Sequence, residues 1–297
     1  MSRKISVLSQ VNLLPNAQQL VAEFAGHDIC FPVDSPNAEE VLVARTEDSE
    51  AILIVLSVKL GSSYLDACPA VKYVGLCGTS TANVDLGALA ARGVAFSNVV
   101  GYGDEPTAEF IFMQLVKLAR GVGPYQWKSM PRELMGKSLT IIGLGALGKA
   151  MADLAIAYKM QVNYYSKHRK RDWEERGLQF GELRDLLPRS DVVVTSLATD
   201  VKVLGETEFA AMKNETIFVQ ASIGETFEKQ AFLRWISRGN NFAILDYAAG
   251  EQNHQTYKDL PRVIFPRIVA GHTQETKERL GQKVLENLKS YFEKSRQ

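Results

Sequence analysis

Ser138-Leu139-Thr140-Ile141-Ile142-Gly143-Leu144-Gly145-Ala146-Leu147-Gly148 is an apolar run that leads directly into three spaced glycines. A triplet with this spacing binds a dinucleotide where it ends a strand and opens a helix, and the surrounding sequence predicts both elements. The first glycine allows a tight turn, the second lets the backbone approach a pyrophosphate, and the third lets helix and strand pack closely. The free N–H groups that open the helix, at Ala146 and Leu147, attract the anion. We therefore predict a dinucleotide-binding Rossmann fold; the alternative is an ordinary glycine-rich turn.

The next predicted strand, Gln161 to Tyr165, decides which dinucleotide is expected. It ends without a carboxylate, at Ser166, Lys167, His168 and Arg169, followed by Lys170 and Arg171. An acid at this point would bind a free 2′-hydroxyl and repel a 2′-phosphate, whereas a hydroxyl with fixed cations binds the phosphate. The sequence therefore favours NADP(H), with NAD(H) as second choice; the alternative is a solvated basic loop.

The composition excludes several classes of partner. The 297 residues carry 34 Lys+Arg and 34 Asp+Glu, so bulk charge gives no reason to expect nucleic acid or a membrane surface as a partner. The longest apolar run, Ala51 to Val58, has the length of a strand and is too short to cross a bilayer. The N-terminal residues lack the pattern of a signal peptide. We expect a cytoplasmic protein with a small-molecule substrate.

The cysteines and histidines predict no metal site. Cys30, Cys68 and Cys77 have no metal-ligand spacing, and the four histidines form no pair at zinc spacing. We expect the three cysteines to be buried free thiols in a reducing compartment.

Short apolar runs alternate with longer amphipathic segments along the whole chain, which is typical of βα units and parallel sheets. A helix is predicted from Thr107 to Arg120, with Asp104 as its N-cap, and a Gly- and Pro-rich segment from Gly121 to Gly136 then precedes the next domain. An amphipathic helix is predicted from Gln274. The other predicted strands are Ile5–Leu8, Ala51–Val58, Tyr73–Leu76, Val94–Ser97, 191–196, Ile217–Gln220, Phe242–Leu245 and 263–265. The fold class is therefore α/β, with doubly wound parallel sheets.

Along nearly its whole length the chain resembles the D-isomer-specific 2-hydroxyacid dehydrogenases. The resemblance is carried by Gly136-Lys137 before the glycine triplet, Gly78-Thr79, Asn83-Val84-Asp85-Leu86, Ala90-Ala91-Arg92-Gly93-Val94 and the segment from Gly101 to Glu109. It implies a smaller, flavodoxin-like substrate domain (residues 1–99 and 274–297) into which a Rossmann cofactor domain (100–273) is inserted. It also implies hydride transfer between NAD(P)H and a 2-keto or 2-hydroxy acid, and a homodimer.

The family uses an Arg to anchor the substrate carboxylate, a His to transfer the proton and a Glu to support that His. In this sequence the Glu is matched by Glu251. The Arg is replaced by Ile223, and an ungapped match puts Ile268 at the position of the His, while a shift of one residue offers Arg267. Losing a general acid costs roughly 10²–10⁴ in rate, so the reaction centre is expected to be altered.

Three groups are candidate replacements. His272 lies on the same loop, Arg267 supplies a cation, and Glu251 is itself an acid if an apolar site raises its pKa. The alternatives are a histidine bonded to backbone, a solvated arginine and a surface carboxylate. The resemblance further places the substrate carboxylate at Thr79, Ser80 and Thr81. Ser196, Leu197, Ser222, Ile223 and Asp246 are predicted to complete the cofactor site.

Three functions follow as hypotheses. The first is an NADP(H)-dependent oxidoreductase that acts on a carbonyl or hydroxyl compound with an altered active site. The second is a catalytically silent protein that senses dinucleotide occupancy. The third is an ordinary 2-hydroxyacid dehydrogenase whose His–Glu pair is hidden by misalignment.

Overall fold

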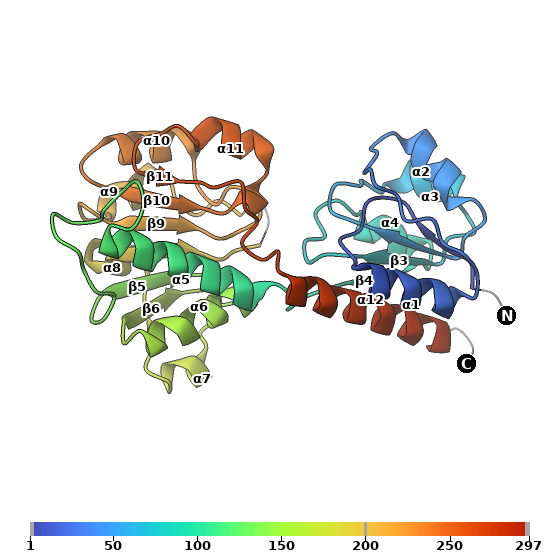
Figure 1. The fold of residues 1–297 in the computed structure, drawn as a ribbon, viewed down its shortest axis with the longest axis horizontal. Helices are drawn as coiled ribbons and strands as arrows, with labels where there is room; N and C mark the ends of the chain where they lie inside the picture. The colour runs from blue at the N-terminus through green and yellow to red at the C-terminus, as the bar shows by residue number, and fades with distance from the viewer. Residues whose placement is uncertain (1–2, 199–200, 295–297) are drawn as a thin grey trace. The chain divides into compact units, whose positions relative to one another are not determined.

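The computed structural model of the chain describes residues 3–198 and 201–294. It divides into two compact units, Met1–Tyr102 with Thr273–Gln297, and Gly103–His272 (Figure 1). The predicted boundaries lie at 99/100 and 273/274; residues 1–2, 199–200 and 295–297 of the predicted domains fall outside the described residues. Each unit has its own parallel sheet with helices on both faces, and the α/β class is confirmed.

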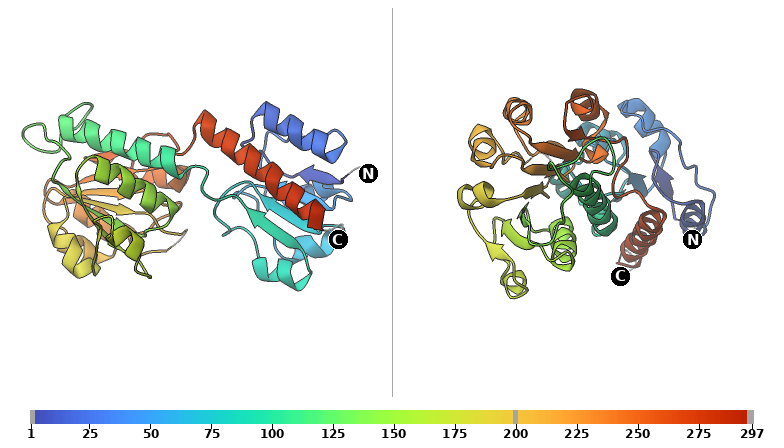
Figure 2. Two further views of the ribbon diagram at one scale, coloured as in Figure 1. Left: turned by 90° about the horizontal axis from the view of Figure 1, so that it is seen from below. Right: turned by 60° about the vertical axis from the view of Figure 1, so that its left-hand side comes forward.

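Unit 1 is built on four parallel strands in chain order, β1-β2-β3-β4. Their bounds are Ile5–Val7, Ala51–Ile54, Tyr73–Leu76 and Ala95–Asn98. One face carries α1 (Pro15–Ala25) and α12 (Gln274–Lys294), which lie side by side in Figures 1 and 2. They pack so closely that a Cβ on Gly281 would lie 2.5 Å from the Cβ of Ala17. The other face carries α2 (Glu39–Thr46), α3 (Ser62–Ala67) and α4 (Leu86–Ala91).

The strand order of unit 1 differs from the flavodoxin-like order, in which a further strand lies outside the first one. The segment that follows α1 in the chain, residues 27–34, belongs to no strand. It is joined to the loop after β1 by one bond, in which the Gln10 N–H donates to the Asp34 carbonyl at 2.7 Å. The four described strands therefore run in one direction without a reversal of order.

Unit 2 contains a seven-stranded parallel sheet in the order β11-β10-β9-β8-β5-β6-β7. The strands are β5 (Ser138–Ile142), β6 (Gln161–Tyr165), β7 (Gln179–Phe180), β8 (Val192–Thr195), β9 (Ile217–Gln220), β10 (Phe242–Leu245) and β11 (Val263–Ile264). The order reverses at β5, which lies between β6 and β8. Ligands of open α/β sheets bind at the carboxyl ends of the strands where such a reversal occurs.

Two layers of helices cover this sheet. On one face lie α5 (Asp104–Arg120), α6 (Ala146–Ala157) and α7 (Arg171–Glu174). On the other lie α9 (Glu206–Ala211), α10 (Lys229–Ser237) and α11 (Glu251–Tyr257). The remaining short elements are α8 (Leu183–Leu186) and the 3₁₀ turns η1 (Leu187–Arg189) and η2 (Tyr247–Ala249). Burial of β5, β8, β9 and β10 on both faces explains their almost uninterrupted apolar sequences.

Three details of the sequence prediction are wrong. The N-cap of α5 is Gly103, and Asp104 is already helical. The segment from Gly121 to Gly136 does not separate domains but packs within unit 2, where the buried Trp127 indole donates to the Glu215 carbonyl at 2.7 Å. Cys30 is exposed, while Cys68 and Cys77 are buried; all three are free.

No described helix combines the length and the apolar character needed to cross a membrane. Nor do His, Cys, Asp and Glu side chains of the described residues form a group of three or more that could hold a metal ion.

Candidate active site

The glycine turn lies at the carboxyl end of β5, where the strand order reverses. Gly143 has a φ of 99°, and a Cβ there would lie 2.2 Å from the Ser196 carbonyl oxygen. A Cβ on Gly148 would lie 2.2 Å from the Gly143 carbonyl oxygen, so side chains are excluded at both positions. A Cβ on Gly145 would meet no atom within 4 Å. The turn therefore fits a pyrophosphate: two glycines close the backbone, and the third leaves room in front of α6.

The N-terminus of α6 presents the other residues of the motif. Gly145 is the N-cap, Ala146 is exposed and Leu147 is half-buried. Helix α6 has twelve residues, and no side chain caps its first turn. Its first N–H groups thus have no partner within the helix, which is the arrangement that attracts an anion.

The loops after β8 and β9 are tied to each other beside this turn. The Ser196 N–H donates to the Ile142 carbonyl at 2.9 Å, and the Leu197 N–H donates to the buried Ser222 hydroxyl at 2.7 Å. The predicted cofactor residues Ser196, Leu197 and Ser222 therefore lie together with Gly143 at one edge of the sheet.

Gln220 organises the loop in which Ile223 replaces the expected arginine. Its side chain is buried, and its Nε2 donates to the carbonyls of Ser222 and Gly224. Its Oε1 accepts hydrogen bonds from Thr195 and Thr226. The loop is therefore held by a buried amide, and the half-buried Ile223 contributes no polar group.

Of the cations in the basic loop after β6, Arg169 is committed to an ion pair, whereas Lys167 is not. Arg169 forms an ion pair with Glu174, and its guanidinium lies 5.2 Å from the centre of the Phe180 ring. Hydrogen bonds from Arg169 and Tyr164 hold the pKa of Glu174 down at about 2. Lys167 is exposed and makes no ion pair within the described part of the chain. The hydroxyl of Ser166 donates to the carbonyl of the exposed His168.

Asp246, at the end of β10, connects two loops. Its Oδ1 accepts from the N–H groups of Ala248 at 3.1 Å and Ala270 at 3.0 Å. The side chain is buried, and desolvation raises its pKa. Asp246 therefore fixes the loop after β11 relative to the turn that carries Glu251.

Glu251 pairs with Arg267 at the place where the family has a Glu–His pair. Its Oε2 accepts from Arg267 Nη2 at 2.7 Å and from the Tyr247 hydroxyl, and its Oε1 accepts from Gln255 Nε2 at 2.5 Å. The Arg267 guanidinium also lies 5.9 Å from the centre of the Tyr247 ring. Of the two residues offered by the alignment, it is therefore Arg267 that meets Glu251, whereas Ile268 is 53% exposed.

This geometry contradicts the hypothesis that Glu251 is a neutral acid. Hydrogen bonds from Tyr247, Gln255 and Arg267 hold the pKa of Glu251 at about 2. The carboxylate is exposed and ionised at neutral pH, because its surroundings are polar rather than apolar.

His272, the third candidate, ends unit 2. Its side chain is exposed, and its backbone N–H donates to the Val269 carbonyl at 3.0 Å. The loop after β11 thus carries both a fixed cation and an imidazole.

The sequence of unit 2 identifies the family of the chain. Residues 112–270, more than half of the chain, match the NAD-binding domain of the D-isomer specific 2-hydroxyacid dehydrogenases. The chain belongs to this family. It is an NAD(P)-dependent oxidoreductase of the D-2-hydroxyacid dehydrogenase type.

Similar proteins of this family include two archaeal glyoxylate reductases. The chain is 27% identical to the one from Korarchaeum cryptofilum over 86% of this chain and 83% of the relative. It is 26% identical to the one from Aeropyrum pernix over 94% and 90%. Among solved structures, a glyoxylate reductase from Paecilomyes thermophila superposes with a TM-score of 0.83 at 24% identity, over 99% of this chain and 96% of that one.

The resemblance to the 2-hydroxyacid dehydrogenases also predicts a carboxylate-binding loop after β3 in unit 1. There the Thr79 hydroxyl donates to the Val99 carbonyl at 2.9 Å, and the Asn98 amide donates to the Thr79 carbonyl at 2.7 Å. The Thr81 carbonyl accepts from the Val84 N–H at 3.1 Å. Thr79 is exposed, and Ser80 and Thr81 are half-buried. Thr79, the first residue of the loop, thus holds the loop to the end of β4.

Two residues important to this 2-hydroxyacid dehydrogenase site were not predicted from the sequence. Tyr247 and Gln255 stand four positions before and four positions after Glu251, and both donate to its carboxylate. Gln255 lies on α11 with Glu251, at the spacing at which side chains of one helix meet, so the pattern could have indicated it. Tyr247 precedes Gly250 and lies outside that helix, so its contact with Glu251 depends on the turn between them. Gln220 gave no such pattern, because its role depends on loops that meet only in the fold.

Proposed function

We propose that this chain is an NADP(H)-dependent oxidoreductase that reduces a carbonyl substrate bearing an anionic group, and that Arg267 is the cation that receives this group. The observation that carries the proposal is the contact between Arg267 and Glu251. A guanidinium held by a carboxylate stands where the family holds an imidazole in the same way.

The dinucleotide fits the turn after β5. When bound, it supplies or accepts the hydride of the reaction. Gly143 and Gly148 close the turn, Gly145 leaves space for phosphate oxygens, and the first N–H groups of α6 bind them. The preference for a 2′-phosphate rests on Ser166 and Lys167, since Arg169 is already paired with Glu174.

Arg267 is suited to hold and polarise a substrate but not to protonate it. A guanidinium offers five donors in a planar fork that matches a carboxylate, and it keeps its proton in proteins. Glu251 and Tyr247 fix its orientation while leaving 63% of its side chain exposed. The exposed area is available to a second anion. The proton of the reaction then comes from solvent rather than from this pair.

The test is consumption of NADPH with matched carbonyl compounds. Glyoxylate and pyruvate are compared with neutral aldehydes and ketones of the same size. We expect turnover with the acids, and a higher KM for them in Arg267→Gln. Lys258→Gln is the control, because Lys258 lies in the same unit and pairs only with Asp259, at 4.0 Å. Turnover confined to the neutral compounds would refute the role of Arg267.

A second function is favoured by one specific observation: Ile223 replaces the usual clamp, and neither Ile268 nor Arg267 supplies the proton of the usual acid. If NADPH binds but the whole panel is silent, the chain is a dinucleotide-responsive binding protein instead of a catalyst.

We also propose a homodimer formed through unit 2. Large apolar side chains are exposed on α5 and on the segment that follows it: Met113, Val122, Met130 and Met135. Contact with a second copy of the chain would remove these apolar side chains from water. Light scattering should give twice the chain mass of 32.9 kDa, and Met113→Glu with Met130→Glu should give the single mass.

A further inference from the structure

We infer a second ligand site in unit 2, at the edge of the sheet opposite the glycine turn, that takes a small organic anion. A cavity of about 550 Å³ is lined there by the first residues of β5, β6 and β7 and by the segment before β8. A volume of this size is typical of small-molecule sites. The lining residues used below are Ser138, Met160, Asn163, Arg176, Arg189 and Asp191.

The cavity is distinct from the dinucleotide site. Ser138 is the first residue of β5 and lines the cavity, whereas the glycine turn follows Ile142 at the other end of the strand. Five residues of strand span roughly 16 Å. A ligand bound at the amino edge therefore leaves the carboxyl edge free.

Asn163 supplies a donor to the lining of the cavity. Its side chain is only 5% exposed, and its Oδ1 accepts from Arg189 Nη2 in a long contact of 3.4 Å. Its Nδ2 donates to no group in the described part of the chain, and the atom is accessible rather than sealed in the core. An acceptor atom on a ligand in the cavity can therefore receive this N–H.

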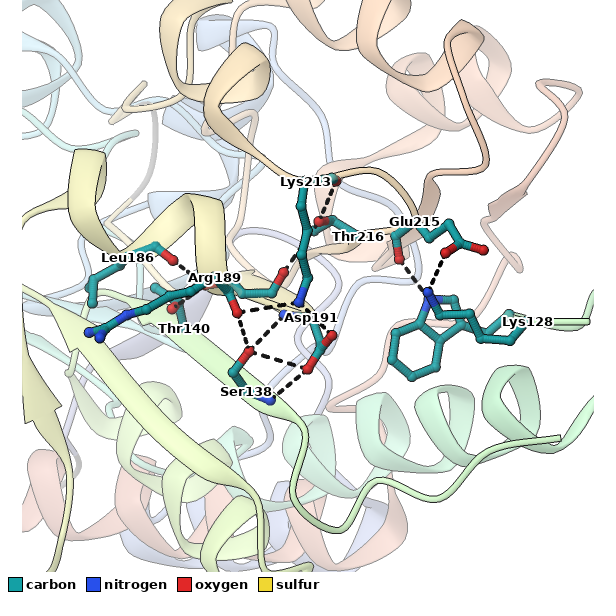
Figure 3. A network of polar contacts seen from close by, with 11 residues as sticks. Lys128, Ser138, Thr140, Leu186, Arg189, Asp191, Lys213, Glu215 and Thr216 are labelled. Atoms are coloured by element: carbon teal, nitrogen blue, oxygen red, sulfur yellow. Dashed lines mark hydrogen bonds and ion pairs between the residues drawn. The ribbon is translucent and has the colours of Figure 1, made fainter. Parts of the chain in front are cut away.

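Arg189 supplies an uncommitted charge. Its backbone is fixed, because its carbonyl accepts from the Ser138 hydroxyl at 2.6 Å and from Lys213 Nζ at 3.3 Å. Its side chain extends away from these contacts in Figure 3 and has no carboxylate partner among the described residues. Arg176 adds a second guanidinium to the lining, although it is paired with Asp153.

The carboxylate in the lining does not cancel this positive charge. Asp191 Oδ1 accepts from Lys213 at 2.7 Å, and its Oδ2 accepts from the Ser138 N–H at 2.9 Å (Figure 3). Burial alone would raise the pKa of Asp191, but the bonds from Lys213 and Ser138 outweigh it and lower the pKa. Asp191 is thus ionised, and Lys213 neutralises its charge.

Most of the lining surface is polar, and the buried side chains of Met160, Val162 and Leu178 supply its smaller apolar part. Donors without acceptors in such a lining select a small carboxylate or phosphate monoester, and they discriminate against a neutral alcohol of the same shape.

The experiment uses the full chain saturated with NADPH and the fluorescent probe 8-anilinonaphthalene-1-sulfonate. Phenylacetate, phenyl phosphate and benzyl alcohol compete with the probe. We expect the two anions to displace it and the alcohol not to, the stronger anion showing whether carboxylate or phosphate is preferred. Arg189→Gln and Asn163→Leu should each weaken probe binding about tenfold or more. Arg238→Gln is the control, because this exposed arginine of the same unit does not line the cavity.

Three results would overturn the inference. The first is unchanged probe binding in both variants with an unchanged melting temperature. The second is equal competition by benzyl alcohol. The third is loss of the probe when NADPH is added, which would place it at the carboxyl edge. None of these depends on which carbonyl compound the enzyme reduces.

Discussion

The turn after β5 and the loops after β9 and β11 lie at the same edge of one sheet, yet only the first keeps the pattern of the family. In the turn, Gly143 and Gly148 leave no room for a Cβ. In the loops, Ile223 stands where the resemblance predicts an arginine, and Glu251 contacts Arg267 rather than a histidine. The packing of the backbone excludes side chains at Gly143 and Gly148, whereas the side chains in the loops can change while the backbone keeps its path. Sterics therefore constrain the turn, and the charge of Arg267 and Glu251 is the main feature of the loops.

The largest expected effect separates a glycine that closes the turn, Gly148, from the glycine that faces the pyrophosphate, Gly145. Gly148→Ala places a Cβ 2.2 Å from a carbonyl oxygen and should lower the free energy of unfolding by about 1–3 kcal/mol. Gly145→Ala meets no protein atom and should leave the melting temperature unchanged. It should still weaken NADPH binding by roughly 100-fold, since its methyl group blocks two or more charge-assisted bonds to phosphate. Calorimetry and thermal denaturation measure both effects.

Normal NADPH binding by Gly145→Ala would contradict this assignment of the three glycines. If Gly145→Ala binds NADPH normally, the open space in front of α6 does not hold the pyrophosphate, and the retained turn has only a structural role.

The next largest effect tests whether Arg267 binds an anionic substrate. Arg267→Gln removes a charge-assisted, bidentate contact and should raise the KM for an anionic substrate by roughly ten- to a hundredfold. Glu251→Gln keeps the cation but loosens it, so its effect should be smaller. The ratio of KM for glyoxylate to KM for a neutral aldehyde is the measurement. Equal ratios in the unchanged chain and in the Arg267→Gln and Glu251→Gln variants would show that Arg267 does not contact the substrate.

A smaller effect is expected in the basic loop. Lys167→Ala should weaken NADPH binding about tenfold and leave NADH binding unchanged, because only the 2′-phosphate needs the ammonium group. Lys229→Ala is the control, because this exposed lysine of the same unit lies on α10, outside the basic loop. Glu174→Gln is informative as well, since it releases Arg169 from its ion pair and should strengthen NADPH binding. Equal loss of both dinucleotides in Lys167→Ala would mean that the loop is only a solvated face.

The fold was predictable where local pattern and burial agree. Strands β3, β6, β9 and β10 have the predicted bounds, because each of them is a short apolar run between turns. Strand β7, with two residues at the sheet edge, has too little sequence to indicate it. The Gly- and Pro-rich segment after α5 resembles a linker, and its contacts with Glu215 and Phe242 in the structure show that it packs within unit 2.

The candidate site was predictable in its residues but not in its pairing. The sequence left Arg267 and Ile268 as alternatives, because a single residue of register cannot be fixed without the loop. The bond from Ala270 to the buried Asp246 holds that register, and it joins segments that are 24 residues apart. The commitment of Arg169 to Glu174 was missed for a similar reason: the partner belongs to the short helix α7, which composition does not predict.

The smallest expected effect concerns the dependence of activity on pH. A reaction centre with a histidine loses its acid as the pH rises through about 6.5. Here Glu251 has a pKa of about 2, and Arg267, beside Tyr247 and Glu251, has a pKa raised above its usual value. The pair stays ionised between pH 5 and 9, so kcat/KM for an anionic substrate should be flat there. A fall above about pH 6.5 that disappears in His272→Asn would instead assign the proton to His272.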